Sequence, residues 1–317
     1  MKEFKFKSKA ISAKTILEAN IGKFPMLLEN ILPMYGVVAL GGSSDLGKSY
    51  LLQQLAAAVA TNAESFLGFE LNINIPSAIY VATEDDFYAM NTRLKNFEKQ
   101  FEGKSLESLR FMFDYHNLAQ EISAELSYEP ASLVVIDTFA DVFNKAINDS
   151  IAVRGFLGEF RSIAHKHKCL IIFNHHCGKN NDTRPPSKDN LLGSQGFESS
   201  MRTVLELRQD LNNPDYRHLC IVKSNHVGKE FKYNSFELDY NFETGFKNTG
   251  NRIPFHELSS ARKGFNDPAI KGRIFEMRNA GITIRDIASR LKEDGIPIGK
   301  TKVGDIVKET CPPPKPI

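Results

Sequence analysis

One stretch of the sequence combines residue types that can hold a phosphate group. Residues 41–50 read GGSSDLGKSY and follow the apolar run YGVVAL, so that a GxxxxGK[ST] pattern comes directly after a strand-like segment. Glycines let the backbone fold around an anion with N–H groups pointing inward, while the lysine can pair with the β- and γ-phosphates and the serine can ligate Mg²⁺. The pattern predicts binding of ATP and Mg²⁺ by Gly42, Ser43, Ser44, Asp45, Leu46, Gly47, Lys48, Ser49 and Tyr50.

Two acidic residues follow other strand-like runs and can complete this chemistry. Asp137 ends the run SLVVID, where a carboxylate can hold the water shell of Mg²⁺ beside the phosphate loop. Glu84 lies in IYVATEDD, where it can orient the water that attacks the γ-phosphate. A strand-ending Asp can also be a simple turn residue, and three consecutive acidic residues can be a solvated loop.

Strand-like and helix-like segments alternate along the part of the chain that must position these residues. Helical patterns such as 49–63 and 152–168 separate the first strand-like segments, which favours an α/β fold with a mostly parallel sheet. The later strand-like segments have turn signals such as NNPD between them, which favours an antiparallel sheet edge. The expected parallel strands are 36–41, 77–82, 110–115, 132–137 and 169–174, and the later ones are 203–208, 218–223 and 233–240.

Composition shifts suggest the domain boundaries. We expect a basic arm over 1–24, an ATPase domain over 25–258, a linker over 259–267, a small all-α domain over 268–310 and a Pro-rich tail over 311–317. Residues 178–192 are polar and rich in turn formers, so they are expected to form a mobile loop. The net charge is +2, but residues 1–24 carry six Lys/Arg against two Asp/Glu, so polyanions should meet the ends of the chain or local basic loops.

The cysteine spacing and the apolar stretches of the sequence indicate the compartment in which the protein resides. The four cysteines form no CxxC pair, the chain opens without an apolar signal core, and no apolar stretch approaches the roughly 20 residues of a membrane helix. These features predict a soluble cytoplasmic protein with reduced thiols.

Five segments taken together resemble the RecA-like ATPases, and within them the RepA-type hexameric plasmid replicative helicases. The resemblance covers about residues 25–245, and its order and spacing are more specific than any single motif except the first. The segments are GGSSDLGKS, YVATEDD followed by Arg93, VVIDTF, FNHHCGK and GSQGFESSMR.

This resemblance implies a nucleotide held between adjacent subunits of a homo-oligomer, with Glu84 as base and Arg93 stacking near the adenine. It also implies that His176 senses the γ-phosphate and that Arg202 reaches into the neighbouring subunit's site. Lys223 resembles a second basic finger, although Asn225 stands where many relatives have arginine. A zinc site at His175, His176 and Cys177 is a rival interpretation, but consecutive residues cannot easily all face one metal.

Two segments are candidates for nucleic-acid contact. In a ring, the loop after His176 would face the channel, where Lys179, Arg184 and Lys188 can track the phosphates of single-stranded DNA. The region 268–310 resembles a helix-turn-helix. Thr283 opens its second helix with Asp286 in a capping box, and a third helix begins at Lys300. The basic residues that can contact duplex DNA are Arg285, Lys300 and Lys302. A solvated loop and a protein-docking domain are the respective alternatives.

Three functions fit these features. The first is a replicative helicase-like DNA motor of a plasmid or mobile element, with a RecA-like core and a helix-turn-helix domain. The second is an ATP-controlled DNA-binding regulator, and the third is a recombination or mobilisation accessory ATPase without unwinding activity. The full set of catalytic candidates favours the motor, because a nucleotide sensor can do without Glu84 and Arg202.

Overall fold

The computed structural model describes residues 10–97, 101, 103–178, 181–193, 195–259, 268–294, 296 and 298–310. The chain divides into two compact units, of which the first comprises residues up to 179 together with 187–253, and the second comprises 180–186 and 254–317. None of the helices within the described ranges is long and apolar enough to cross a membrane.

The first unit is built on a nine-stranded, mostly parallel sheet in the order β13-β12-β11-β10-β3-β9-β8-β6-β7. The strands from β7 to β10 in this order are parallel, while β11 is antiparallel to both β10 and β12. The mixed α/β fold and the mostly parallel sheet expected from the sequence are present. The strands are β3 (Gly36–Gly42), β6 (Ala78–Ala82), β7 (Leu109–Met112), β8 (Leu133–Asp137), β9 (Leu170–His176), β10 (Thr203–Gln209), β11 (Tyr216–Ser224), β12 (Asn234–Asn241) and β13 (Gly245–Pro254).

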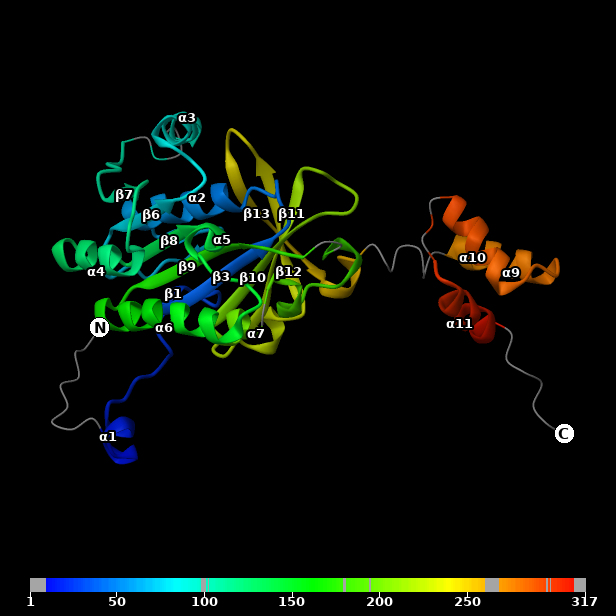
Figure 1. Cartoon of the computed structure of the whole chain (residues 1–317), viewed down its shortest axis with the longest axis horizontal. Helices are drawn as coiled ribbons and strands as arrows, with labels where there is room; N and C mark the ends of the chain where they lie inside the picture. Colours follow the sequence, from blue (N-terminus) through cyan, green and yellow to red (C-terminus); the bar gives the residue numbers. More distant parts are fainter. Residues whose placement is uncertain are drawn as a thin grey trace. The chain divides into compact units, whose positions relative to one another are not determined.

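Helices cover both faces of this sheet, and alternate residues of each strand supply the two cores. Val38 and Leu40 belong to the core under α2, whereas Val37 and Ala39 belong to the core under α6. Figure 1 shows α2 on one side of the sheet and α6 and α7 on the other. The helices of this unit are α1 (Ala13–Glu18), α2 (Lys48–Ala60), α3 (Phe87–Phe97), α4 (Leu118–Tyr128), α5 (Phe139–Val142), α6 (Ser150–His167) and α7 (Gln195–Ser200).

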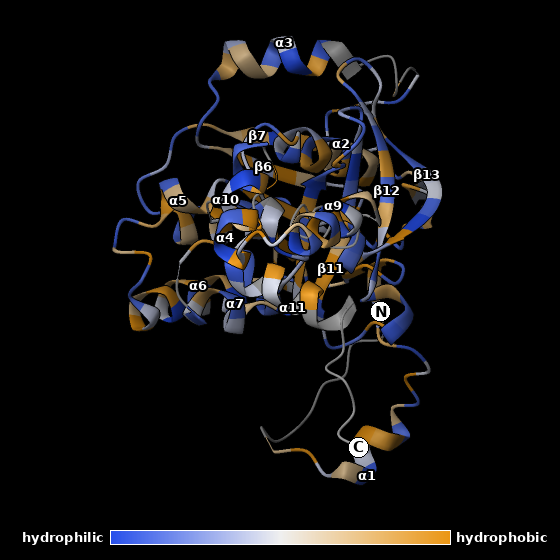
Figure 2. Ribbon diagram, turned by 90° about the vertical axis from the view of Figure 1, so that its right-hand side faces the viewer, coloured by the Kyte–Doolittle hydropathy of each residue, from blue (hydrophilic) through white to orange (hydrophobic). Residues whose placement is uncertain are grey.

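Smaller elements complete the first unit. The short strands β1 (Met26–Leu28) and β2 (Leu32–Pro33) form one ribbon, and β4 (Ser65–Phe66) and β5 (Phe69–Glu70) form another. The helix α1 buries none of its six residues, and its hydrophobic positions are coloured orange in Figure 2.

The region expected to be a mobile loop, 178–192, contains more structure than its composition suggests. It carries the 3₁₀ turns η2 (Asn181–Thr183) and η3 (Lys188–Asn190), and Cys177 forms a β-bridge with Leu191. The carboxylate of Glu206 accepts hydrogen bonds from Ser187 N at 2.9 Å and from the side chain of Asn190. These bonds hold the second half of the loop against β10.

Among its described residues, the second unit has the α-helices α9 (Pro268–Asn279), α10 (Ile284–Glu293) and α11 (Lys300–Thr310), packed around an aliphatic core. Thr283 caps α10 by accepting a hydrogen bond from Asp286 N at 3.2 Å, as the sequence predicts. The expected linker 259–267, apart from residue 259, and the tail 311–317 lie outside the described residues.

Candidate phosphate-binding site

The phosphate loop connects the central strand β3 to α2, and two of its glycines are required by its shape. Gly47 is the N-cap of α2 and has φ 83°, a left-handed conformation that a glycine adopts without strain. A Cβ added to Gly42 would lie 2.7 Å from the carbonyl oxygen of Leu207 on β10. The loop is therefore held against the neighbouring strand at a distance that leaves no room for a side chain.

Lys48 is the first residue of α2 and lies buried in this loop. Its ammonium group donates a hydrogen bond to Ser43 O at 2.6 Å. Burial lowers the pKa of Lys48, and the Cys177 thiol followed by the carboxylates of Asp137 and Glu84 opposes this shift. The ammonium group thus lies where a bound phosphate could replace the Ser43 carbonyl as its partner.

Asp137 ends β8 as a buried carboxylate that two neighbouring strands hold in place. Tyr80 of β6 donates its hydroxyl hydrogen to one carboxylate oxygen, and Asn174 of β9 donates its amide to the other. Burial raises the pKa of Tyr80 well above its usual value, and the Asp137 charge adds to this shift, so the phenol remains a donor. Sequence reasoning did not identify Tyr80 or Asn174, although a polar side chain within a buried apolar strand requires a partner.

The side chains around Asp137 suit a hard divalent cation such as Mg²⁺. Asn174 Nδ2 lies 3.5 Å from Ser49 Oγ and also bonds to Asp137, so these three side chains meet at one place. Asn174 Oδ1 is buried and has no hydrogen-bond partner among the described residues. Hydroxyl and carboxylate oxygens are ligand types that Mg²⁺ takes, so Ser49 and Asp137 could hold the ion, whereas Asn174 turns its amide nitrogen toward both.

Glu84 follows β6 and reaches the same edge of the sheet. It lines the pocket together with Lys48. Partial burial raises the pKa of Glu84, with further contributions from Asp137, Asp141 and Asp85. Glu84 remains exposed, and its raised pKa makes the carboxylate a stronger base than a glutamate whose pKa is not shifted.

A small network fixes the ends of β6 and β8 beside Glu84. Asp141 of α5 accepts hydrogen bonds from the hydroxyls of Thr83, at 2.6 Å, and Thr138, at 2.7 Å. Thr83 Oγ1 also lies 2.7 Å from Asp137 O and accepts a hydrogen bond from Thr138 N at 2.8 Å. The segments that carry Glu84 and Asp137 are therefore tied together, an arrangement that sequence reasoning did not find.

The two consecutive histidines at the end of β9 have different surroundings. His176 lines the pocket, and burial together with Lys48 lowers its pKa. His175 is fully buried, bonds to Leu192 O at 2.6 Å and packs against the ring of Phe197. Among the residues that the structure describes, no group of three or more His, Cys, Asp or Glu side chains could hold a metal ion, so the zinc interpretation finds no support.

The pocket extends from the phosphate loop to a wall of aromatic rings. It has a volume of about 580 Å³, and its lining includes Tyr50, Tyr240, Phe242 and the half-buried Arg93. The Arg93 guanidinium makes two hydrogen bonds to Asp85. Planar groups at this side of the pocket can stack on a nucleobase. The phosphate-loop residues that line it are Ser44, Asp45, Leu46, Gly47, Lys48, Ser49 and Tyr50.

Arg202 and Lys223 lie at the opposite end of the sheet from the phosphate loop of the same chain. Arg202 packs against Gly36 at the start of β3, where a Cβ would lie 3.0 Å from its side chain. Lys223 forms an ion pair with Glu198 at 3.1 Å and donates to Glu198 O at 2.7 Å. Neither side chain joins the pocket of its own chain.

The residues expected to contact DNA are placed as follows. Lys188 forms an ion pair with Glu198 at 3.1 Å, which raises the pKa of the lysine. Its ammonium group is therefore already paired with a carboxylate of the same chain. Arg184 is exposed in the second unit, as are Arg285 at the start of α10 and Lys300 at the start of α11. Lys179 and the side chain of Lys302 lie outside the described residues.

Comparison with known protein families assigns the chain to one of them. A family model described as an AAA domain matches residues 3–182, more than half of the chain. The chain belongs to this AAA domain family. An AAA domain is a P-loop ATPase domain, so the protein is a nucleotide-binding P-loop ATPase. A search among curated proteins finds no match.

Proposed function

We propose that the protein is an ATP-driven DNA motor, a helicase-like ATPase in the replication of a plasmid or other mobile element, working as a hexameric ring in the cytoplasm. The observation that carries this proposal is the convergence of Lys48, Glu84, Asp137 and His176 at the edge of the sheet where the parallel strands end. A nucleotide sensor needs the phosphate loop alone. A base and a γ-phosphate contact beside that loop favour hydrolysis.

In this proposal each side chain has a distinct task at the phosphates. Lys48 pairs with the β- and γ-phosphates, and Glu84 orients the attacking water. Ser49 and Asp137 hold Mg²⁺, which would neutralise charge on the phosphate oxygens. His176 contacts the γ-phosphate from β9, where its lowered pKa makes it a neutral donor before nucleotide arrives.

The base of the nucleotide is assigned to the aromatic side of the pocket. Arg93, fixed by Asp85, would stack on one face of the adenine. Tyr240 and Phe242 are side chains with ring faces on the same side of the pocket. Stacking of this kind tolerates different bases, so we expect modest discrimination between ATP and GTP.

Arg202 and Lys223 are assigned to the active site of the neighbouring subunit. β3 has seven residues, and at roughly 3.3 Å per residue its two ends are about 20 Å apart. Arg202 lies at one end and the phosphate loop begins at the other, so Arg202 of this chain cannot reach its own γ-phosphate. An arginine supplied in trans would make hydrolysis depend on assembly.

Two regions are assigned to DNA. The loop with Lys179, Arg184 and Lys188 would contact single-stranded DNA in the ring channel. The three helices of the second unit would contact duplex DNA in the manner of a helix-turn-helix, with Lys300 at the start of the last helix. The exposed Arg285 and Lys300 support this assignment.

One assay tests the motor proposal most directly. ATP turnover and fork unwinding are measured with and without single-stranded DNA, for the wild type and for Lys48→Ala. We expect DNA to stimulate turnover and the wild type to unwind the fork, with both activities lost in the variant. Turnover that ignores DNA, without unwinding, would favour an ATP-controlled regulator or an accessory ATPase instead.

A second experiment tests the role assigned to Arg202. Arg202→Ala should bind ATP normally but lose hydrolysis, because only the transition state needs this charge. Arg154→Ala, which removes an exposed arginine on α6, is the matched control and should hydrolyse ATP at the wild-type rate. Normal hydrolysis by Arg202→Ala would refute the role in trans.

A third experiment tests the second unit in the full chain. Arg285→Ala and Lys300→Ala should weaken duplex binding and reduce its salt dependence while leaving basal ATP turnover unchanged. Unchanged duplex affinity would favour a protein-docking role for the three helices.

A further inference from the structure

A buried arginine outside the sequence motifs reaches the phosphate loop from another part of the chain. Arg217 of β11 is 6% exposed, and its Nε donates a hydrogen bond to Leu46 O at 3.3 Å. Leu46 immediately precedes Gly47, the left-handed residue that begins α2. The contact therefore acts on the backbone where the loop turns into the helix.

The same guanidinium is anchored by the hairpin that joins β10 to β11. Its Nη1 donates to Pro214 O and, at 3.0 Å, to Tyr216 O. Within this hairpin, Asp210 accepts hydrogen bonds from Asn212 N at 2.7 Å and Asn213 N at 2.8 Å. The hairpin thus has a fixed shape, and it fixes Arg217 in turn.

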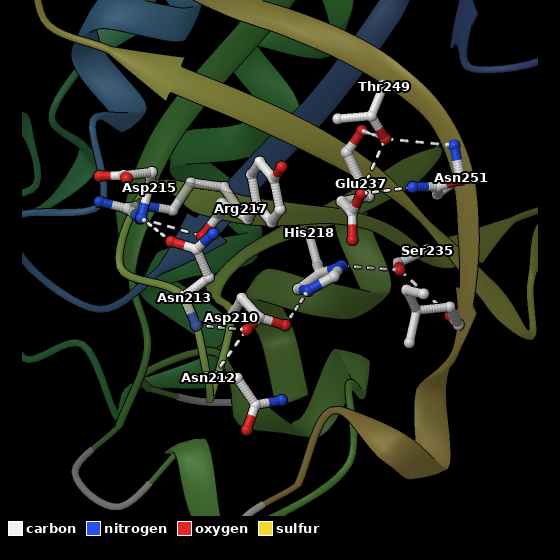
Figure 3. A network of polar contacts seen from close by, with 12 residues as sticks. Asp210, Asn212, Asn213, Asp215, Arg217, His218, Ser235, Glu237, Thr249 and Asn251 are labelled. Carbon is white, nitrogen blue, oxygen red and sulfur yellow. Dashed lines mark hydrogen bonds and ion pairs between the residues drawn. The ribbon is translucent and has the colours of Figure 1, made fainter.

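A buried histidine ties this hairpin to the next strand. His218 bonds to Asp210 at 2.9 Å through Nε2 and to the hydroxyl of Ser235 on β12 at 3.1 Å through Nδ1. Figure 3 shows this chain of contacts beneath Arg217. The support of Arg217 extends through two strands of the sheet.

Two aromatic rings also pack against this part of the loop. The Arg217 guanidinium lies 5.1 Å from the centre of the Tyr240 ring, which stacks on Phe246 with the centres 4.5 Å apart. A Cβ added to Gly47 would lie 3.0 Å from each of these rings. Leu46 and Gly47 are therefore held by a hydrogen bond from Arg217 and by packing against two rings, one of which Arg217 also contacts.

We propose that Arg217 is a positioning residue that holds the Leu46–Gly47 backbone and the Tyr240 ring in their nucleotide-binding arrangement before nucleotide arrives. The inference rests on the proposed function, because it assumes that the nucleotide phosphates bind this loop. A loop that is already ordered does not lose conformational freedom on binding, so its affinity for phosphate is higher. Arg217 itself is not among the residues that line the pocket.

The test is nucleotide affinity in Arg217→Met, a change that keeps an apolar stem and removes the guanidinium. We expect the Kd for Mg·ATP to rise about tenfold, the effect of losing one hydrogen bond to a charged donor. KM should rise in parallel while kcat changes less than threefold. Arg217→Lys should give an intermediate Kd, because one ammonium cannot reproduce the planar fork that serves three carbonyls.

Arg252 provides a matched control for general loss of stability. It also stacks on a ring, 4.0 Å from the centre of Phe236, and donates at 2.9 Å to Ser235 O and to Asn234 O. It is not part of the pocket lining. Arg252→Met should lower the unfolding temperature of the nucleotide-free protein by a similar amount but leave the Kd for Mg·ATP unchanged.

Competition with inorganic tripolyphosphate measures the affinity of the phosphate loop without the contribution of the nucleotide base. Because Arg217 holds the Leu46–Gly47 backbone, Arg217→Met should weaken the binding of tripolyphosphate, and the loss for ATP should be at least as large because ATP also loses the positioned Tyr240 ring. Wild-type affinity in a folded Arg217→Met protein, or an equal loss in Arg252→Met, would overturn the inference. A wild-type protein that binds neither ATP nor tripolyphosphate would overturn the proposed function, and the inference with it.

Discussion

Acidification should reveal the buried His175 in the stability of the protein. The imidazole packs against Phe139 and Phe197, its Nε2 bonds to Leu192 O at 2.6 Å, and its Nδ1 is buried with no partner among the described residues. Burial lowers the pKa of His175 from 6.5 to about 4, and the nearby charges of His176 and Lys48 act in the same direction. A proton added at Nδ1 would place an unpaired charge in an aromatic core.

The size of the effect follows from the two pKa values. Between pH 6.5 and pH 4 the unfolded chain binds a proton at His175 and the folded chain does not, so the free energy of unfolding must fall as the pH falls. At 1.36 kcal/mol per pKa unit, this side chain should remove about 2–3 kcal/mol between pH 7 and pH 4.5.

Urea denaturation of the wild type and His175→Gln at both pH values measures this contribution. The variant is expected to be less stable at pH 7, but its free energy of unfolding should fall by about 2–3 kcal/mol less than that of the wild type on acidification. His116→Gln, which changes an exposed histidine in the same unit, should follow the wild type. Parallel losses in the wild type and His175→Gln would show that the folded protein tolerates a charge at this position.

Three further substitutions test the phosphate-binding site. Glu84→Gln should lower the rate of single-turnover hydrolysis by about 10² to 10⁴-fold. Because the folded-state pKa of Glu84 is raised, the variant should also have a higher free energy of unfolding at pH 7. A less stable variant would contradict this reasoning. Tyr80→Phe removes a donor to Asp137, so a titration with Mg²⁺ at fixed ATP should show weaker half-saturation, and an unchanged titration would exclude this support for the metal. Gly42→Ala places a Cβ 2.7 Å from a backbone carbonyl of β10, so it should lower the free energy of unfolding by about 1–3 kcal/mol and abolish most nucleotide affinity. Gly158→Ala in α6 has no atom within 4 Å of the added Cβ and should raise the free energy of unfolding by about 0.5–1 kcal/mol. Equal effects at the two glycines would refute the packing argument.

The elements that could be predicted from the sequence are those with a strong local pattern. The strand β3 is an apolar run ending in glycine, and α2 follows it as a continuous helical segment, so both were expected within a few residues of their observed bounds. β13 was missed because its sequence, GFKNTGNRIP, is a polar edge strand without regular apolar alternation. Its pairing depends on β12 rather than on its own composition.

The same distinction applies to the candidate site. The residues between Gly42 and Ser49 form a contiguous motif, so their spacing alone predicts a phosphate loop. The partners of Asp137 come from two other strands, and Arg217 lies 171 residues beyond the carbonyl that it bonds. No local pattern encodes such contacts, because they depend on strand order and register, which only the folded sheet determines.

The phosphate loop follows one end of β3, and Arg202, which immediately precedes β10, packs against Gly36 at the other end. If Arg202 at one end serves the phosphate loop of the next subunit, two inactive variants should restore each other when mixed. In rings that contain both Lys48→Ala and Arg202→Ala chains, some interfaces pair an intact phosphate loop with an intact arginine. Mixing should therefore recover a fraction of ATP turnover that neither variant shows alone, and the recovered fraction at each mixing ratio would count how many adjacent intact interfaces a working ring requires.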